Sequence, residues 1–226
     1  LDSLANFLNI ESIYRIEGFD ISHTSGKNVS ASCVSITKNG PNKKNYRIMN
    51  IKNDSNNDYQ ALSEAIHRRC KNLKKNNVNL PEVILLDGGK GQLNTVKKYL
   101  AEEFLEKIKF ISISKGPNRN ERYDTLHHDN NSYPLKNSFE ISKLLQLVRN
   151  ESHRFAINHH RNRRTKEMFS SNLDGIKGLG PKLKLNLIRY FGGMHKVIEA
   201  SVDDLKSAPG IGESKAKKIH SYLKNY

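Results

Sequence analysis

The sequence predicts an α/β domain with a mixed β-sheet and flanking helices, followed by a small all-α domain. Three observations support this prediction. Strand-like and helix-like runs alternate through the first half of the chain, one long amphipathic helix follows them, and a glycine pattern occurs twice in the last quarter. We place the boundary in the charged and polar stretch 163–172, which gives domains at residues 1–164 and 165–226.

The first three predicted strands form an antiparallel meander. They span residues 14–22, 28–38 and 45–52, and turn-forming residues separate them at 24–26 and 39–41. Because both connections are short, consecutive strands are expected to pair as antiparallel neighbours.

The next elements predict a parallel part of the sheet. A helix with one apolar side begins near Asp58, and the apolar run 82–87 predicts a buried central strand. A glycine-rich turn, a helix to about Phe104 and a strand at 109–114 then complete a β-α-β unit. A sheet that combines a meander with such a unit is mixed, with helices packed on it.

The remainder of the first domain is predicted as a polar, irregular segment and a long helix. The segment covers 115–137 and contains a short hairpin with arms at 122–126 and 132–135. Residues 139–162 carry apolar residues at helical spacing, which predicts one continuous helix.

Charge and cysteine content limit the class of protein. Lysine and arginine total 38 against 23 acidic residues, a net charge of +15, which indicates a polyanionic partner. A low-GC genome would explain part of this excess, but not its clustering at 154–166 and around the C-terminal glycines. Cys33 and Cys70 lack metal-ligand spacing, which argues against a zinc site or a disulfide scaffold and fits a reducing interior.

No segment indicates a membrane or a secretory pathway. No apolar run approaches the roughly 20 residues that span a bilayer, and no signal peptide is visible. We therefore expect a cytoplasmic protein, and a monomer. Since the chain begins with Leu1 rather than Met, we expect it to be part of a longer protein.

Two aspartates occupy positions where a carboxylate needs a partner. Asp20 lies inside the first predicted strand, and Asp87 ends the buried strand. A carboxylate in an apolar strand costs free energy unless it is paired or bound to a metal. If the two strands are neighbours, both carboxylates point at one spot, where oxygen ligands suit Mg²⁺ or Mn²⁺. Such an ion activates water and stabilises charge on a phosphodiester.

Each of these residues also has an ordinary explanation. Asp87 precedes two glycines and could be a turn former or a helix cap. His153, on the long predicted helix, is a candidate third ligand or an unremarkable residue of an amphipathic helix.

The run 88–92 lacks the spacing and the Ser/Thr of a P-loop, which excludes nucleotide hydrolysis, although Lys90 could contact a DNA phosphate.

A Gly-apolar-Gly pattern occurs twice near the C-terminus, at 178–180 and 210–212, each time between helical segments. This is the helix-hairpin-helix pattern, in which glycines permit a tight hairpin and the next helix offers free N–H groups to a phosphate. It predicts DNA-backbone binding that is independent of sequence and sensitive to salt. The alternative is a helical bundle that binds protein. The residues expected to contact DNA are Gly178, Gly180, Lys182, Gly210, Gly212 and Lys215.

The chain resembles the C-terminal half of the UvrC subunit of bacterial nucleotide-excision repair. The resemblance is carried by four features that occur in the same order, namely the runs 19–24, 86–93 and 149–156 and the doubled hairpin. The resemblance covers essentially the whole chain. It implies an RNase H-like endonuclease domain that cuts double-stranded DNA on the 5′ side of a lesion, and a tandem helix-hairpin-helix domain that engages DNA near the incision. The segment that meets the damage-loading subunit UvrB belongs to an N-terminal half that is expected to be absent here.

The resemblance also implies roles for particular residues. Asp20 and Asp87 match the family's catalytic aspartates and His153 its catalytic histidine, which implies that these three hold the divalent metal. Asp58 matches a further acidic position of catalytic importance.

Two basic positions beside the family's site match Lys90 and Lys115, which implies contacts with DNA. Two other classes of function remain open. One is a non-catalytic DNA-binding scaffold whose sheet domain is a relic. The other is a nuclease of the same fold that acts on RNA or on DNA junctions.

Overall fold

The computed structural model describes residues 1–24, 28–51, 58–115, 123–136, 139–171, 173 and 175–224. These residues form two compact units, Leu1–Asn158 and His159–Tyr226. Helix α5 (Phe139–Ser171) begins in the first unit and ends in the second, so it is longer than the helix predicted at 139–162. The boundary predicted between residues 164 and 165 lies inside this helix, and the division into those two domains remains a prediction.

The first unit is built on a mixed sheet. In the described part of the chain, eight strands form one sheet in the order β3-β2-β1-β5-β6-β7-β8, with β4 also paired to β2. β1 (Arg15–Thr24) is antiparallel to β2 (Asn28–Thr37), which is in turn antiparallel to β3 (Gly40–Pro41) and β4 (Arg47–Ile51). The predicted meander is therefore confirmed.

A parallel crossover leads to the second half of the sheet. β1 is parallel to β5 (Val83–Asp87), and β5 is parallel to β6 (Lys109–Lys115). The crossover contains two helices, α3 (Lys90–Lys98) and α4 (Glu102–Lys107), where the sequence predicted one. That prediction was wrong because buried residues of both helices pack into one cluster, so their spacing alone could not reveal the break.

A short hairpin completes the sheet. β7 (Asp124–His128) is antiparallel to β6 and to β8 (Asn131–Pro134). Asp129 and Asn130 between them have positive φ angles of 44° and 63°, as a tight two-residue hairpin turn requires. The predicted hairpin is confirmed, with strands at 124–128 and 131–134 where arms at 122–126 and 132–135 were predicted. Residue 122 lies outside the described residues.

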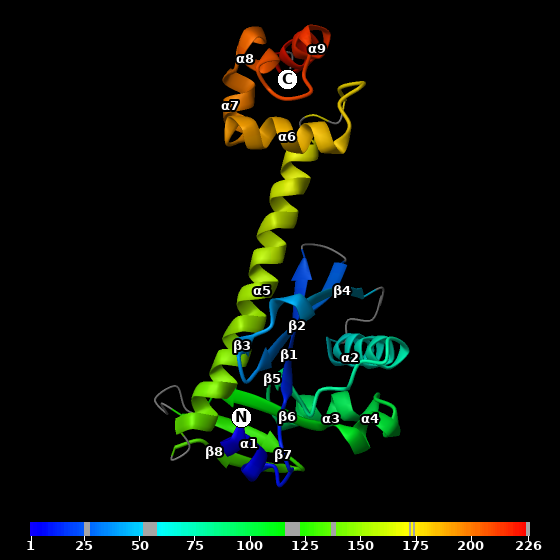
Figure 1. Ribbon diagram of the computed structural model, residues 1–226, viewed down its shortest axis with the longest axis vertical. Helices are drawn as coiled ribbons and strands as arrows, with labels where there is room; N and C mark the ends of the chain where they lie inside the picture. Colours follow the sequence, from blue (N-terminus) through cyan, green and yellow to red (C-terminus); the bar gives the residue numbers. More distant parts are fainter. Residues whose placement is uncertain are drawn as a thin grey trace. The chain divides into compact units, whose positions relative to one another are not determined.

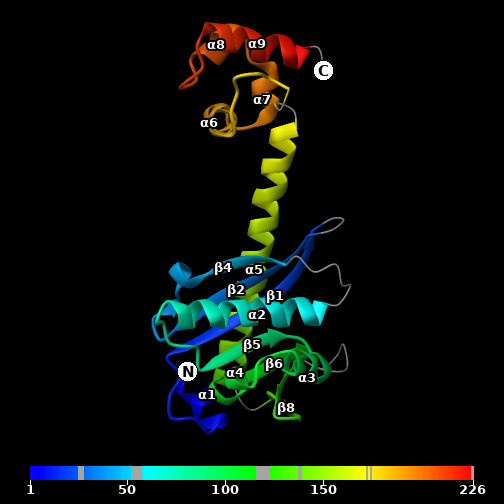
Figure 2. The ribbon, with the colours of Figure 1, turned by 90° about the vertical axis from the view of Figure 1, so that its right-hand side faces the viewer.

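Helices cover both faces of this sheet (Figures 1 and 2). α2 (Asp58–Lys75), α3 and α4 pack on one face, where Phe19, Leu86 and Phe110 are buried. α5 and a helix that the pattern did not predict, α1 (Asp2–Phe7), pack on the other face. Because side chains alternate along a strand, every second residue of β1 and β5 faces α5.

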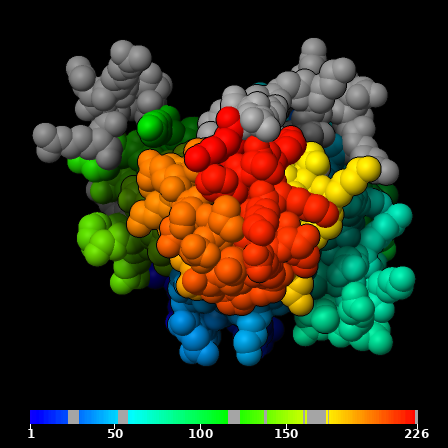
Figure 3. Space-filling view, turned by 90° about the horizontal axis from the view of Figure 1, so that it is seen from above, coloured from blue at the N-terminus to red at the C-terminus, as the bar shows by residue number. Residues whose placement is uncertain are grey.

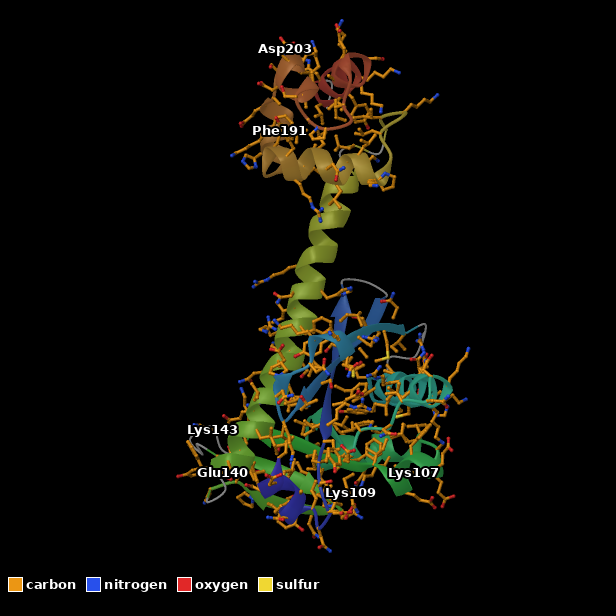
Figure 4. All side chains as sticks on the ribbon, in the orientation of Figure 1. Lys107, Lys109, Glu140, Lys143, Phe191 and Asp203 are labelled. Atoms are coloured by element: carbon orange, nitrogen blue, oxygen red, sulfur yellow. The ribbon has the colours of Figure 1, made fainter. Side chains whose placement is uncertain are left out.

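The second unit is helical and has its own apolar core. Figure 3 looks onto this unit, where α7 and α8 in orange pack beside α9 in red. Figure 4 marks Phe191 at the end of α6 and Asp203 in the first turn of α8. Among the residues described here, no helix is long and apolar enough to cross a membrane. The helices are α6 (Pro181–Phe191), α7 (Met194–Glu199), α8 (Val202–Lys206) and α9 (Glu213–Lys224).

A buried ion pair fixes α2 to the central strand. Glu17 of β1 is fully buried and accepts two hydrogen bonds from Arg69, from Nη2 to Oε1 at 2.7 Å and from Nε to Oε2 at 3.1 Å. The Arg69 side chain is itself only 4% exposed. Arg15 Nε lies farther from the same carboxylate, at 3.5 Å, so Arg69 is its main partner.

Replacing Arg69 with Met would leave the Glu17 carboxylate without this buried partner. We expect the free energy of unfolding to fall by about 3–5 kcal/mol, because an unpaired buried charge is costly. The neighbouring Arg68 is exposed and pairs with Glu64 on the surface, so Arg68→Met should cost less than about 1 kcal/mol. Urea denaturation measures both values, and equal losses would contradict a special role for the buried pair.

Candidate active site

The pairing of β1 with β5 brings Asp20 and Asp87 to neighbouring positions. Phe19 lies opposite Leu86 in the parallel register, so the next residue of each strand lies beside the other. Phe19 and Leu86 face α2 and α3, and the two aspartates therefore face the side covered by α5. The strands that the metal hypothesis required to be neighbours are neighbours.

Helix α5 supplies His153 to the same corner of the sheet. Its Nδ1 atom lies 3.6 Å from Oδ2 of Asp20, with the imidazole 65% exposed and the Asp20 side chain 15% exposed. Burial raises the pKa of Asp20, the charge of His153 lowers it, and the charge of Asp87 raises it again. Two like charges thus stand close together here, an arrangement that a bound cation would relieve.

Gly18 lets α5 approach the sheet closely beside this corner. A Cβ atom at Gly18 would overlap Cγ1 of Val148 and would lie 3.4 Å from the Val148 carbonyl oxygen. Val148 precedes His153 by about one and a half helical turns. Since Gly18 and Asp20 lie on the same face of β1, the close contact at Gly18 determines where His153 meets Asp20.

Hydrogen bonds anchor the same part of α5 to other elements. They are side-chain contacts that the sequence did not single out, and the only hint of them was the polar content of the long helix. They join Arg149 Nη1 to Asp124 Oδ1 at 3.2 Å, Ser32 Oγ to the Ser152 carbonyl at 3.2 Å, and Tyr46 OH to Glu151 Oε1 at 2.7 Å.

The three predicted ligands share this corner without forming a tight cluster. Asp20 and His153 are in contact, and Asp87 follows on the adjacent strand. Within the described ranges, no three His, Cys, Asp or Glu side chains lie close enough to hold one ion together. Ligation of an ion would therefore need small side-chain movements, which the exposed His153 can make.

Asp58 is the exposed first residue of α2, and its neighbours connect it to the loop after Asp87. Nε2 of Gln92 donates to the Tyr59 hydroxyl at 3.2 Å, and Oε1 of Gln92 accepts from the amide of Gly89 at 2.9 Å. These contacts tie the start of α2 to the carboxyl end of β5. Sequence reasoning assigned no role to Tyr59 or Gln92, although Gln92 lies within the run 86–93, because a sequence pattern does not show which distant side chains meet.

The two basic residues predicted beside the site lie at the same edge of the sheet. Lys90 is the first residue of α3, Lys115 is the last residue of β6, and both are exposed. Figure 4 marks Lys109, which begins β6 at the opposite end of the strand.

In the second unit, the two hairpins adopt the conformation that the glycine pattern predicts. Gly178 and Gly210 have positive φ angles of 87° and 82°, which favour glycine. Leu179 and Ile211 are buried in the core, as expected of the apolar residue between each pair of glycines. The other predicted contact residues surround the starts of α6 and α9: Gly180 and Lys182 at α6, and Gly212 and Lys215 at α9.

The hairpins pack against each other's helices. A Cβ atom at Gly210, in the second hairpin, would lie 2.7 Å from Cδ2 of Leu183 in α6. A Cβ atom at Gly175, before the first hairpin, would overlap the ring of Tyr222 in α9. This reciprocal packing joins the two hairpins into one body.

A mixed sheet with helices on both faces is the fold of an RNase H-like domain, here followed by a helical hairpin domain. Residues 5–157 match the family model described as the UvrC RNase H endonuclease domain, and residues 170–225 match the SAM-like helix-hairpin-helix tandem. The chain belongs to the UvrC family.

Relatives named UvrABC system protein C align with nearly the whole chain. The protein of Pseudomonas fluorescens Pf-5 is 38% identical over 226 residues, covering 98% of this chain and 37% of the relative. That of Methylococcus capsulatus is 40% identical over 215 residues, covering 94% of this chain and 35% of the relative. The chain therefore spans little more than a third of the length of these relatives.

A solved structure of human ENDOV is a distant neighbour. It is 12% identical, with a TM-score of 0.40, and the alignment covers 67% of this chain and 86% of that one. This similarity is too low to support a functional conclusion.

Substituting Gly18 tests the close approach of α5. In Gly18→Ala the added methyl group collides with Val148, and we expect the free energy of unfolding to fall by about 1–3 kcal/mol. Gly91, in the first turn of α3, has open space around it, so Gly91→Ala should be neutral or stabilise the protein by up to about 1 kcal/mol. Denaturant unfolding of both variants measures the difference, and a neutral Gly18→Ala would refute the close approach.

Proposed function

We propose that this chain is a metal-dependent endodeoxyribonuclease that makes the 5′ incision beside a lesion in nucleotide-excision repair. The observation that carries the proposal is the position of Asp20 and Asp87 on paired parallel strands, with His153 in contact with Asp20. Family membership supports it, since the relatives are named as components of the UvrABC system.

The donor set suits a hard divalent cation. Two carboxylates are ligands that Mg²⁺ and Mn²⁺ prefer, and an imidazole adds a nitrogen donor that Mn²⁺ accepts more readily than Mg²⁺, so we assign Asp20, Asp87 and His153 to hold one of these ions. When bound, such an ion lowers the pKa of a water molecule and stabilises charge on a phosphodiester. The partly buried Asp20 provides a restrained carboxylate, and the exposed His153 can turn towards the ion after DNA arrives.

The surrounding residues have supporting roles in this proposal. Asp58 adds negative charge at the start of α2 and takes part in catalysis beside the metal ligands. Lys90 and Lys115 bind phosphates of the strand on either side of the incised bond.

The second unit contributes non-specific binding to the DNA backbone. First-turn amides of α6 and α9 lack partners within their own helices, and the positive end of each helix dipole favours an anion. Lys182 and Lys215 add charge at these helix starts. The residues assigned to this contact are Gly178, Gly180, Lys182, Gly210, Gly212 and Lys215.

The substrate and partners of this proposal belong to a longer protein. The substrate is double-stranded DNA that contains a lesion, loaded by a UvrB subunit that binds another part of the full-length chain. We expect the protein to be monomeric and cytoplasmic.

A second candidate is a non-catalytic DNA-binding scaffold. It is favoured by one observation, namely that no three candidate ligands in the described residues are gathered for an ion. The two functions differ in whether the Asp20–Asp87 corner binds Mn²⁺.

Asparagine substitutions distinguish these candidates. In Asp20→Asn and in Asp87→Asn, we expect Mn²⁺-dependent nicking to fall at least about a hundredfold, because each removes a ligand charge. Mn²⁺ binding by calorimetry should be lost and DNA affinity retained. Glu106→Gln, an exposed carboxylate of α4, serves as the control and should keep all three properties. Full nicking in both Asp variants would reject the endonuclease, and absent Mn²⁺ binding by the unaltered chain would favour the scaffold.

Charge removal in the hairpin domain tests its phosphate contacts. We expect Lys182→Gln and Lys215→Gln each to reduce the slope of log affinity against log salt by about 0.9, one phosphate contact apiece. Lys224→Gln is the matched control, since Lys224 is exposed in the last turn of α9, at the end of that helix opposite to Lys215. Fluorescence anisotropy at several salt concentrations measures the slopes, and unchanged slopes in both variants would disprove these contacts.

A further inference from the structure

A pocket in the first unit lies near the carboxyl end of β6, on the face of the sheet that α3 covers, and has no role in the function described so far. Its volume is about 500 Å³, and it is formed by β6 and the β7–β8 hairpin. Lys115 was the only lining residue connected with DNA above. The residues with polar side chains that line it are Ser114, Lys115, Tyr123, Thr125, His127, Ser132 and Lys136.

His127 is held between two serine side chains. Its Nε2 atom lies 2.8 Å from Oγ of Ser114, and its Nδ1 atom lies 2.8 Å from Oγ of Ser132. The residue is 7% exposed, and burial lowers the pKa of His127, with the charge of Lys90 lowering it further. At neutral pH the ring is therefore uncharged.

A neutral imidazole between two hydroxyl groups orients one of them towards the pocket. The ring has one N–H donor and one bare nitrogen, so one serine accepts from the ring and the other donates to it. The serine that accepts keeps its own hydroxyl hydrogen free for a ligand. This holds for either tautomer of His127, because the two serines occupy both ring nitrogens.

The charge around the pocket selects an anion. Lys115 and Lys136 line it, and Lys90 is close enough to lower the pKa of His127. The described residues that line the pocket include no carboxylate. Ammonium groups together with oriented hydroxyl donors match the oxygens of a phosphate group.

The pocket lies near the carboxyl end of β5, but on the other face of the sheet from Asp87. Ile113 and Leu126 belong to the core against α5, so Ser114 and His127, one residue further along each strand, face the side that α3 covers. Asp87 lies opposite Ile113 in the parallel register, and Ser114 and Lys115 follow Ile113 directly. With strands about 4.8 Å apart and a rise of about 3.3 Å per residue, the Cα atoms of Lys115 and Asp87 are roughly 8 Å apart. Each DNA strand carries a phosphate every 3.4 Å or so of helix axis, so a strand held at Asp87 that passes the carboxyl ends of β5 and β6 brings a later phosphate to Lys115 and the pocket.

We propose that this pocket binds a phosphate group of the DNA strand held at Asp20 and Asp87, after that strand has passed the carboxyl ends of β5 and β6. Lys115 and Lys136 supply the charge, and the Ser114–His127–Ser132 arrangement supplies a directed hydroxyl donor. Binding there sets the position of the strand relative to the metal ligands. The proposal rests on the endonuclease function and adds a positioning subsite to it.

Substitutions of three residues that line the pocket test the proposal. All are made in the full chain that also carries Asp87→Asn, so that bound DNA stays intact. Lys136→Gln should weaken binding of a duplex oligonucleotide and reduce the salt slope by about 0.9. Ser132→Ala is made alone and again together with Ser114→Ala. The double variant should weaken binding roughly two- to tenfold with an unchanged slope whichever tautomer His127 adopts, because it removes the free hydroxyl hydrogen but no charge. Lys71→Gln is the matched control, since Lys71 is an exposed residue of α2, and it should change neither the affinity for the oligonucleotide nor the salt slope.

Nuclear magnetic resonance of the His127 ring identifies the ligand. We expect its ring signals to shift on titration with the oligonucleotide. If inorganic phosphate alone shifts them and none of the pocket variants affects DNA affinity, the site takes a free phosphate compound and the proposal is overturned. Unshifted signals with unchanged affinity also overturn it. Failure of the endonuclease function would appear separately, as absence of Mn²⁺-dependent nicking by the chain without substitutions.

Discussion

The first unit depends on the central strand β1, which pairs with β2 on one side and with β5 on the other. Successive side chains of β1 face opposite sides of the sheet. Glu17 faces α2 and is neutralised by Arg69, whereas Gly18 and Asp20 face α5. A strand that binds helices on both faces and strands on both edges has little freedom to move. That rigidity allows it to hold a carboxylate at a defined position.

The candidate site places like charges together, and the surrounding packing maintains this arrangement. Asp20 and Asp87 lie on adjacent strands, where their mutual repulsion opposes folding unless a cation or His153 compensates for it. The apolar core between the sheet and α5 supplies the stability that the polar corner lacks. Binding a divalent ion would then remove an unfavourable interaction and also create a favourable one.

The two units offer DNA different kinds of contact. The hairpins of the second unit present helix starts and lysines to the backbone, a surface that holds many sequences equally well. The pocket between β6 and the β7–β8 hairpin combines charge with hydroxyl groups in fixed directions, which suits a single phosphate in one orientation. The affinity for DNA and the position of the DNA strand relative to the metal ligands would thus come from separate parts of the chain.

The sequence by itself determined the order of most strands and helices and the doubled hairpin, because apolar periodicity and glycine patterns are local properties. Strand positions made Asp20 and Asp87 candidates, and only the resemblance to a known family added His153 as a ligand. It missed the break between α3 and α4 and the extension of α5, since tertiary packing decides where a helix ends. Only the tertiary structure placed Asp20 beside Asp87 and His153 against Asp20. It also brought Ser114, His127 and Ser132 together in one pocket. Those contacts depend on strand pairing and helix packing between segments far apart in the chain, and no local pattern encodes which distant residues meet.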